Sequence, residues 1–231
     1  MRKVKYGITG STGRMGREIT SVIKEQSFEI VFQLNSKEKI QTGVPDVLID
    51  FSSPSALKET IQTAIEFNSP LVTGTTGLSE NDKEELVNAS RFIPIIQEYN
   101  FSVGIQILLK CTELLKTFLP EWDFEISEIH HRFKKDKPSG TALLIKDILD
   151  NNTQISSHRI GGVPGSHSIL AASSGECLML NHSALTRRTF AEGAVKCALW
   201  LKDKKPGIYS IKDVIFNSKS EEEEKWIHNH L

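Results

Sequence analysis

The sequence is poor in cysteine, carries almost no net charge and contains no long hydrophobic run. Only three cysteines occur among its 231 residues: Cys111, Cys177 and Cys197. They are scattered, odd in number and set in apolar surroundings. This usage predicts buried free thiols in a reducing cytoplasm and argues against both a disulfide framework and a metal site.

The balance of charge excludes further classes of partner. The 28 Lys and Arg residues nearly match the 29 Asp and Glu residues, for a formal net charge of -1. Such a balance gives no general attraction to nucleic acid or anionic membranes, so any electrostatic recognition must be local. No apolar run approaches membrane-spanning length, and the N-terminus enters a strand pattern without the apolar core of a signal peptide. We therefore expect a cytoplasmic protein with neither nucleic-acid nor membrane partners.

The first hundred residues alternate strand and helix patterns. Short apolar runs at residues 4–8, 28–34, 47–51, 70–74 and 92–96 predict five strands. Apolar residues recur at helical spacing between them, and Ser79 is placed to cap a helix over residues 79–90. This alternation predicts βαβ units and a parallel sheet covered on both faces, which is the α/β architecture of a Rossmann-like nucleotide-binding domain.

The pattern changes after Asn100. A long apolar stripe predicts a helix over residues 103–119, and alternation over residues 122–127 predicts a strand with one solvent-facing side. Two further alternating runs suggest antiparallel strands, and residues 189–201 are again helical. We expect a second domain of α+β type, then a solvated acidic tail over residues 218–231. Three histidines lie apart in strand-like regions and are interpreted as structural: His158, His167 and His182.

A glycine-rich turn joins the first strand to the first helix. Its glycines at positions 10, 13 and 16 allow a tight turn and a close approach of the backbone to a pyrophosphate, whose charge the helix start can bind. The spacing departs from G-x-G-x-x-G, and alone it fits a plain structural turn equally well. Its place between a strand and a helix, ahead of four more alternating units, favours dinucleotide binding.

The end of the second strand bears on the choice between NAD and NADP. An acidic residue there would bind the ribose 2′-hydroxyl, whereas a polar or cationic one tolerates a 2′-phosphate. The strand ends at Asn35, with Lys37 nearby and no carboxylate before Glu38, and Arg14 offers a second cation. These residues favour NADPH over NADH. Two loops at later strand ends, residues 74–77 and 99–102, suit a nicotinamide ring, although each alone also fits an ordinary turn.

The segment Glu128–Thr141 concentrates cations and imidazoles ahead of a helix pattern over residues 142–149. It contains His130, His131, Arg132, Lys134, Lys135 and Lys137, and closes with Pro138–Thr141. The N–H groups and dipole of a helix start favour anions, and histidines and lysines supply protons near neutral pH. The segment suits a carboxylated, anionic substrate. The alternative is a solvated basic loop.

Together these motifs resemble the 4-hydroxy-tetrahydrodipicolinate reductase (dihydrodipicolinate reductase) family. The resemblance runs in order from Lys3 to about Val214, and its most specific part is His-His-Arg…Lys…Pro-Ser-Gly-Thr. The matching segments are residues 10–16, 50–54, 74–77, 100–104, 128–134, 136–141, 162–165, 188–194 and 200–201.

The resemblance implies a fold and a reaction. It implies a dinucleotide-binding domain over residues 1–101 and 190–231, completed by a C-terminal helix, and a substrate-binding and tetramerisation domain over residues 102–189. The implied reaction is the NADH- or NADPH-dependent reduction of 4-hydroxy-tetrahydrodipicolinate to tetrahydrodipicolinate, in the diaminopimelate route of lysine biosynthesis, by a homotetramer without a metal.

The resemblance also implies a role for each matching residue. His130 is the implied proton donor or acceptor, and Lys134 the implied proton-donating cation. The backbone and hydroxyl groups of residues 139–141 suit a substrate carboxylate, which makes the expected substrate ligands His131, Ser139, Gly140 and Thr141. The expected cofactor contacts are Gly10, Ser11, Thr12, Gly13, Arg14, Met15, Asn35, Gly74, Thr75, Thr76, Glu98, Tyr99, Asn100 and Phe101. The family often has an acidic residue where this chain has Asn35, which weakens an expectation of NAD preference.

Two other functional classes compete with this interpretation. A non-catalytic nucleotide sensor would use the same sheet, but the sequence has no helix-turn-helix pattern or basic tail through which to act. A reductase of sugars or semialdehydes would need a nucleophilic cysteine or a helical lysine at the domain junction, and neither Cys111 nor Cys177 lies in a suitable loop.

Overall fold

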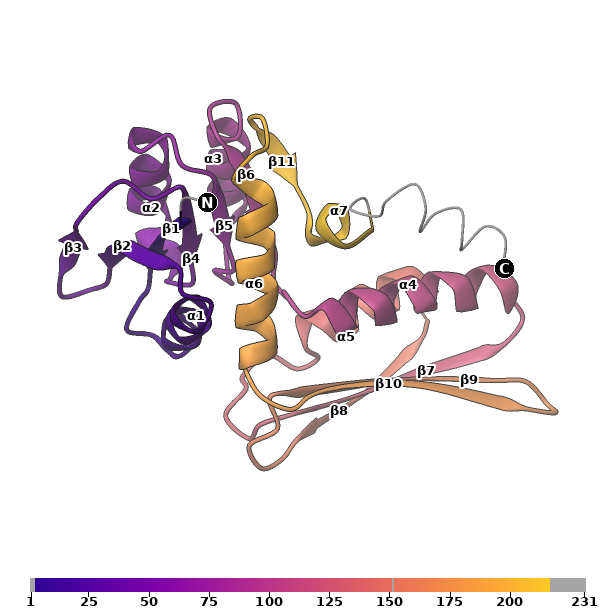
Figure 1. Ribbon diagram of the computed structural model, residues 1–231. Helices are drawn as coiled ribbons and strands as arrows, with labels where there is room; N and C mark the ends of the chain where they lie inside the picture. Colours follow the sequence, from indigo (N-terminus) through magenta and orange to yellow (C-terminus); the bar gives the residue numbers. More distant parts are fainter. Residues whose placement is uncertain (1–2, 151, 217–231) are drawn as a thin grey trace. The chain divides into compact units, whose positions relative to one another are not determined.

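Two hydrophobic sheets organise the chain in the computed structural model, which describes residues 3–150 and 152–216 (Figure 1). The chain divides into two compact units. Unit 1 comprises Met1–Phe101 and Phe190–Leu231, and unit 2 comprises Ser102–Thr189. The acidic tail expected over residues 218–231 lies outside the described residues.

Unit 1 is built on a twisted sheet with seven strands among the described residues, in the order β11-β6-β5-β4-β1-β2-β3. The strands are β1 (Lys5–Thr9), β2 (Glu29–Leu34), β3 (Lys39–Gln41), β4 (Val47–Asp50), β5 (Leu71–Thr73), β6 (Pro94–Gln97) and β11 (Gly207–Tyr209). All pair in parallel except β3, which runs antiparallel to β2 at the sheet edge.

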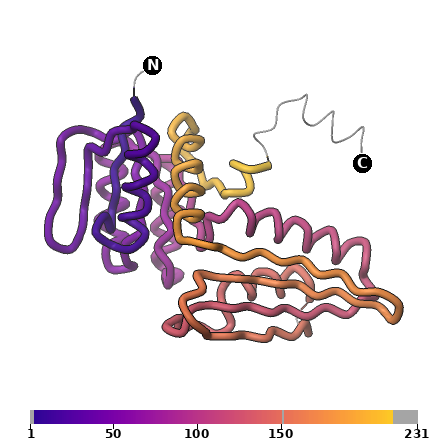
Figure 2. Tube along the Cα trace, turned by 60° about the horizontal axis from the view of Figure 1, so that its bottom comes forward, coloured from indigo at the N-terminus to yellow at the C-terminus, as the bar shows by residue number. Residues whose placement is uncertain are grey.

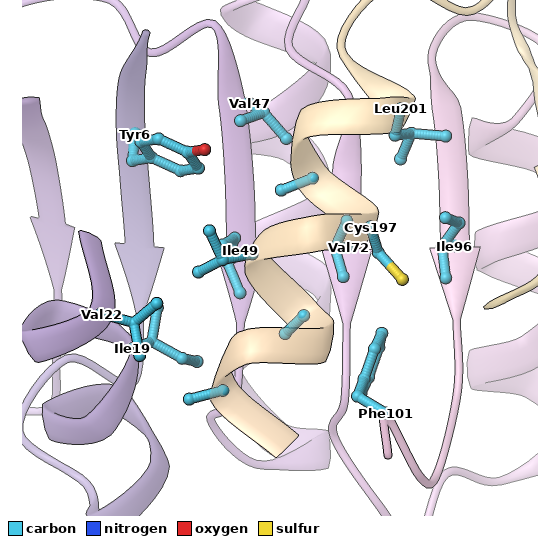
Figure 3. Close-up of a cluster of buried hydrophobic side chains, with 14 of the residues drawn as sticks. Tyr6, Ile19, Val22, Val47, Ile49, Val72, Ile96, Phe101, Cys197 and Leu201 are labelled. Carbon is cyan, nitrogen blue, oxygen red and sulfur yellow. The ribbon is translucent and has the colours of Figure 1, made fainter. Parts of the chain in front are cut away.

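Helices cover both faces of this sheet because its central strands are apolar on both sides. They are α1 (Arg14–Glu25), α2 (Pro54–Glu66), α3 (Glu80–Ala89), α6 (Arg188–Leu201) and α7 (Ile211–Phe216). On one face, α1 and α6 pack over Tyr6, Ile49 and Val72, as Figure 3 shows. On the other face, α2 and α3 pack over Leu48, with a separate core of their own. The result is the expected doubly wound α/β unit.

Helix α6 approaches the segment that follows β6 very closely. A Cβ atom on Gly193 would lie 1.8 Å from the carbonyl oxygen of Phe101, so only glycine fits at this crossing. Phe101 itself is buried in the core under α6 (Figure 3). The start of α6 and the end of the first chain segment of unit 1 are therefore packed against each other.

Unit 2 places two helices on one face of a mixed sheet, whose order is β10-β9-β7-β8. Its elements are α4 (Val103–Phe118), β7 (Asp123–His130), α5 (Gly140–Leu149), β8 (Gln154–Arg159), β9 (Gly165–Ala172) and β10 (Cys177–Ala184). Strands β9 and β10 form a long antiparallel hairpin (Figure 2), and β7 pairs antiparallel with β9 and parallel with β8. Ile105, Ile126 and Ile145 help to form the core between helices and sheet.

Most predicted elements are confirmed, with bounds that differ by one to a few residues. Ser79 caps α3 through a reciprocal capping box with Asp82. The edge strands β3, β8 and β11 and helix α7 were not predicted; β3 makes the sheet of unit 1 mixed, and β8 pairs in parallel with β7 in unit 2, where only antiparallel strands were expected. The expectation of three buried thiols is wrong: only Cys197 is buried, while Cys111 is intermediate and Cys177 exposed. Cys177 lies at the start of β10, where the strand is exposed.

In the described part of the chain, no helix combines the length and apolar character needed to cross a membrane.

Candidate active site

The glycine turn of unit 1 has the geometry of a phosphate cradle. Gly10 adopts a φ of 75°, in the region that glycine favours. A Cβ atom on Gly16 would lie 2.2 Å from the carbonyl oxygen of Gly10, so the turn and the helix start pack tightly. Helix α1 begins at Arg14, and its N-cap residue, Gly13, supplies no side-chain hydrogen bond. The first turn of α1 also lacks an acidic residue, so it suits the pyrophosphate of a dinucleotide.

Asn35 lies beside this turn at the end of β2. Its amide Nδ2 is 3.4 Å from the hydroxyl of Ser11, and its Oδ1 accepts hydrogen bonds from the backbone N–H groups of Lys37 and Glu38. The side chains of Arg14 and Lys37 are exposed. The side chain at the end of β2 is thus an uncharged amide, with the cation Lys37 and the carboxylate Glu38 following it and Arg14 at the start of α1. An amide at this position fits a 2′-phosphate at least as well as a 2′-hydroxyl.

Asp50, at the end of β4, is a fully buried carboxylate surrounded by hydroxyl groups. Its Oδ1 accepts hydrogen bonds of 2.6 Å from Thr9 and from the hydroxyl of Ser52. Its Oδ2 accepts hydrogen bonds of 2.7 Å from Thr73 and Thr75. These residues stand at the carboxyl ends of β1, β4 and β5 or just beyond them, so one carboxylate ties together three loops of the predicted cofactor site.

The remaining cofactor candidates of unit 1 lie on the same edge of the sheet. A Cβ atom on Gly74 would overlap the ring of Phe51, whose centroid is 5.5 Å from that of Phe101. Glu98 accepts a hydrogen bond from the backbone N–H of Ile211, at the start of α7, and burial raises its pKa. The candidates left exposed in this group are Thr12, Thr76 and Tyr99. Met15 and Asn100 are partly buried.

In unit 2, the predicted catalytic histidine belongs to a buried polar cluster around Glu128. The Glu128 side chain is fully buried, and each carboxylate oxygen contacts two nitrogen atoms. Oε1 accepts hydrogen bonds from the Ser139 backbone N–H, at 3.2 Å, and from Arg159 Nη2, at 2.7 Å. Oε2 accepts one from Arg159 Nη1 at 2.8 Å and lies 2.5 Å from His130 Nδ1. The Glu128 carboxylate therefore accepts two hydrogen bonds from the Arg159 guanidinium and contacts the imidazole of His130.

The electrostatics of the cluster keep Glu128 ionised. Burial raises the pKa of Glu128, but hydrogen bonds from Arg159 and His130 outweigh it and bring the pKa to about 2. Burial lowers the pKa of His130, the Glu128 carboxylate raises it, and Lys134 and Arg159 lower it again. His130 thus lies beside a charged carboxylate, but the opposing effects on its pKa leave it able to gain and lose a proton.

Gly165 and His167 also lie beside the His130 ring. A Cβ atom on Gly165 would lie only 3.0 Å from His130 Nε2. The His130 and His167 rings meet edge to face, with centroids 5.1 Å apart. His167 Nε2 lies 3.0 Å from the hydroxyl of Ser139, and burial lowers the pKa of His167 to about 3. Contrary to the expectation of separate structural histidines, His167 therefore adjoins the predicted catalytic residue, and its cross-strand partner is His182.

The predicted substrate ligands gather at the start of α5. Ser139 is its N-cap, and its hydroxyl accepts a hydrogen bond from the Ala142 N–H at 3.2 Å. Because Ser139 is buried and its polar groups contact Glu128, His167 and Ala142, it shapes the helix start from inside. Gly140 follows, with no neighbouring heavy atom within 4 Å of the place where a Cβ atom would lie, and Thr141 is partly exposed.

The basic loop between β7 and α5 carries the other predicted ligands. Lys134 Nζ lies 2.7 Å from Asp136 Oδ2, and the Lys134 side chain is 24% exposed. His131 is partly buried. The backbone carbonyl of Asp136 accepts a hydrogen bond from Arg159 Nη2, which joins the loop to the Glu128 cluster. The loop is thus anchored to the buried cluster, unlike a freely solvated basic segment.

Sequence reasoning missed four residues that organise these groups: Asp50, Glu128, Arg159 and His167. A signal for Glu128 was present, because alternation along β7 places it with His130 on the face of Ile126, opposite the wetted residues. Arg159 and His167 stand on other strands, and their approach depends on pairings that no local pattern encodes.

Comparison with known proteins agrees with this architecture. The family profile described as "Dihydrodipicolinate reductase, N-terminus" matches residues 4–101, and the one described as "Dihydrodipicolinate reductase, C-terminus" matches residues 104–215. Two relatives named 4-hydroxy-tetrahydrodipicolinate reductase are similar over most of their length. The protein from Thermosipho africanus is 42% identical, over 92% of this chain and 98% of its own. The protein from Bdellovibrio bacteriovorus is 43% identical, over 94% and 98%.

A solved structure shares the fold. It is a dihydrodipicolinate reductase from a Paenisporosarcina species with dipicolinate bound, and it superposes with a TM-score of 0.72 at 20% identity. The match covers 93% of this chain and all of the other.

Proposed function

This chain belongs to the dihydrodipicolinate reductase family, and from that premise we propose how its residues carry out the NAD(P)H-dependent reduction of 4-hydroxy-tetrahydrodipicolinate to tetrahydrodipicolinate. The chain is an oxidoreductase of the diaminopimelate route to lysine. The observation that carries the proposed roles is the Glu128–His130–Arg159 cluster, beside an anchored basic loop and an open helix start.

We propose that unit 1 holds the dinucleotide and that unit 2 supplies charge and a proton. The nicotinamide, when bound, supplies the hydride. Lys134 binds a substrate carboxylate and gives a proton, and His130 donates or accepts a proton through Nε2. The start of α5, at Gly140 and Thr141, binds the second carboxylate through its helix dipole and N–H groups. His131 completes the set of substrate ligands.

We test these roles by replacing His130 with Ala and Lys134 with Met. Each change should lower kcat by about 10²–10⁴, the usual range for a lost acid–base group. The KM for the cofactor should stay the same, because the cofactor residues lie in unit 1. Lys135→Met, which removes an exposed lysine from the same loop, is the matched control and should keep full turnover. Normal turnover in both test variants would favour the alternative interpretation, in which the segment is a solvated basic loop.

The cofactor preference is proposed to favour NADPH. Support comes from Asn35 at the end of β2 and from the exposed cations Arg14 and Lys37 near it. An Asn35→Asp change should repel a 2′-phosphate and lower the NADPH-to-NADH ratio of kcat/KM by about tenfold, or about 1.4 kcal/mol. Parallel assays of NADPH and NADH oxidation with freshly made substrate measure kcat/KM for each cofactor. A strong native preference for NADH would contradict the proposal.

A planar dicarboxylate should occupy the same site as the substrate. One relative in the family is known with dipicolinate bound, and the proposed site has two places for carboxylates. Pyridine-2,6-dicarboxylate should therefore inhibit competitively, and pyridine-2-carboxylate should be much weaker because one site is left unpaired. Equal inhibition by the two compounds would contradict the assignment of the His130–Thr141 segment.

The assembly and location are also proposals. A homotetramer formed through unit 2 is consistent with the open face of its sheet, which carries Met179 at 64% exposure. A cytoplasmic location is consistent with consumption of a reduced nucleotide and with three free cysteines. Light scattering on the purified protein measures the number of subunits in the assembly.

A further inference from the structure

No role has yet been assigned to Glu128 in the proposed reaction, although its carboxylate contacts four nitrogen atoms, one of them in the ring of the predicted proton donor. It is buried, ionised and within 2.5 Å of His130 Nδ1. The geometry points to Glu128 as a positioning residue, which fixes the tautomer and ring orientation of His130 and is itself held by Arg159. This inference rests on the proposed role of His130.

The tautomer follows from hydrogen-bond chemistry. An ionised carboxylate is an acceptor only, so the hydrogen between Glu128 Oε2 and His130 Nδ1 must be carried by the nitrogen. In the neutral ring, the lone pair is then on Nε2, and in the charged ring Nε2 carries the transferable proton. In both forms, Nε2 is the nitrogen that gains or loses the transferred proton, and it lies next to Gly165, which presents no side chain.

Arg159 fixes the position of the carboxylate. Its two terminal nitrogens bind the two oxygens of Glu128 separately, and the same nitrogens also donate to the carbonyl groups of His158 and Asp136. A forked pair of this kind resists rotation of the carboxylate. The guanidinium is therefore tied both to β8 and to the basic loop, so that the ring of His130 is oriented by a group with little freedom to move.

The charged groups around His130 come from each neighbouring strand and from the loop. Glu128 raises its pKa, whereas Lys134 of the loop and Arg159 of β8 lower it. His167 of β9 stays neutral near neutral pH because burial lowers its pKa to about 3. Glu128 is thus the one anion in this set, and its removal should shift the titration of His130 to lower pH.

The test variant is Glu128→Gln, which keeps the size of the side chain and removes its charge. We expect kcat to fall about 10²-fold, within the range of a misdirected acid–base group. The limb of the kcat/KM pH profile that belongs to His130 should move to lower pH. The KM for the cofactor should not change. Nitrogen NMR of isotope-labelled histidine should show the Nδ1–H form of His130 in the parent protein and its loss in the variant, with His130→Ala identifying the signal.

Glu125→Gln is the matched control. Glu125 lies on the same strand, β7, but it is exposed and accepts a hydrogen bond from Ser156. The same chemical change there should leave kcat, the pH profile and the His130 signal unaltered. A difference between the two variants therefore reports the contact with His130 and not the loss of a glutamate from β7.

Each outcome decides the question. If Glu128→Gln folds and keeps either the parent turnover or the parent His130 signal, Glu128 is structural and the inference is overturned. If it folds poorly, Glu128→Gln with Arg159→Met removes both charges, and the same loss of the Nδ1–H form is required. Failure of the proposed function is distinct, because His130→Ala would then keep its turnover whatever the NMR of Glu128→Gln shows.

Discussion

The two units of this protein each bury one carboxylate at the edge of a predicted site, and they compensate its charge in different ways. Asp50 of unit 1 receives four hydroxyl hydrogen bonds, and none of its hydrogen-bond partners among the described residues is a cation. Glu128 of unit 2 is held by a guanidinium and an imidazole. Hydroxyl groups do not titrate near neutral pH, so the first arrangement is fixed. The second contains a histidine, so it can exchange a proton.

This difference matches what the two predicted sites must do. A nucleotide site needs loops held in one geometry, and Asp50 connects three of them through Thr9, Ser52 and Thr75. A proton-transfer site needs a group whose charge can change while its position does not. Glu128 and Arg159 supply the fixed part of that arrangement, and His130 supplies the part that titrates.

The largest expected effect comes from removing the cation of unit 2. Arg159→Met leaves Glu128 buried without its main partner, and the free energy of unfolding of unit 2 should fall by about 3–5 kcal/mol. Denaturant unfolding can be followed through Trp122 in unit 2, with the other tryptophans replaced by Phe. Lys110→Met removes an exposed ion pair with Glu113 from the same unit and should change stability by no more than about 0.5 kcal/mol. Equal effects would mean that the buried pair contributes no more than a surface pair.

A smaller loss is expected in unit 1 from Asp50→Asn. The amide keeps one acceptor oxygen and presents an NH₂ group to hydroxyls that now donate to the carboxylate. We expect the free energy of unfolding of unit 1 to fall by about 1.5–3 kcal/mol, the value of a hydrogen bond to a charged group, with a higher KM for the cofactor. Trp200 reports this unit, and Asp203→Asn, at an exposed position, is the control. An unchanged cofactor KM would contradict the role of Asp50 in holding the loops.

The last expected effect is a response to acid that separates the two units. Burial lowers the pKa of His167 to about 3, so His167 stays neutral in the folded state and takes up a proton on unfolding below its ordinary value of 6.5. Unit 2 should therefore lose stability as the pH falls below 6.5, by about 1.4 kcal/mol per pH unit for one such group.

Unit 1 should not share this response. Its described residues include no histidine, and burial raises the pKa of Glu98, which makes acid slightly stabilising there. Unfolding followed through Trp122 and through Trp200 at pH 7 and pH 5 measures both units. His167→Gln should reduce the response of unit 2, the rest of which belongs to His130 and His182, because burial lowers their pKa values too. A parallel loss in both units would contradict the assignment to histidines of unit 2.

The features of the two units that depend on local sequence pattern could be predicted from the sequence. The glycine turn, the cap of α3 and the concentration of cations after β7 were all visible from spacing and residue type. The two buried carboxylates were not, because Asp50 and Glu128 acquire their partners only when separate strands pair. Thr73 reaches Asp50 across β4 and β5, and Arg159 reaches Glu128 across β7 and β8. Such contacts depend on register, which no single segment contains.

The close approach of Gly193 to Phe101 has a consequence for the modularity of the chain. Unit 2 interrupts unit 1 between Phe101 and Phe190, and Phe190 precedes Gly193 on α6 by about one helical turn. The two ends of unit 1 left by excising Ser102–Thr189 are therefore near neighbours in the folded sheet. A short flexible linker should close that gap, because the inserted unit leaves and re-enters its host at a single place. The second segment of unit 1 thus begins in the fold close to where the first segment ends, with unit 2 inserted between them as a single piece.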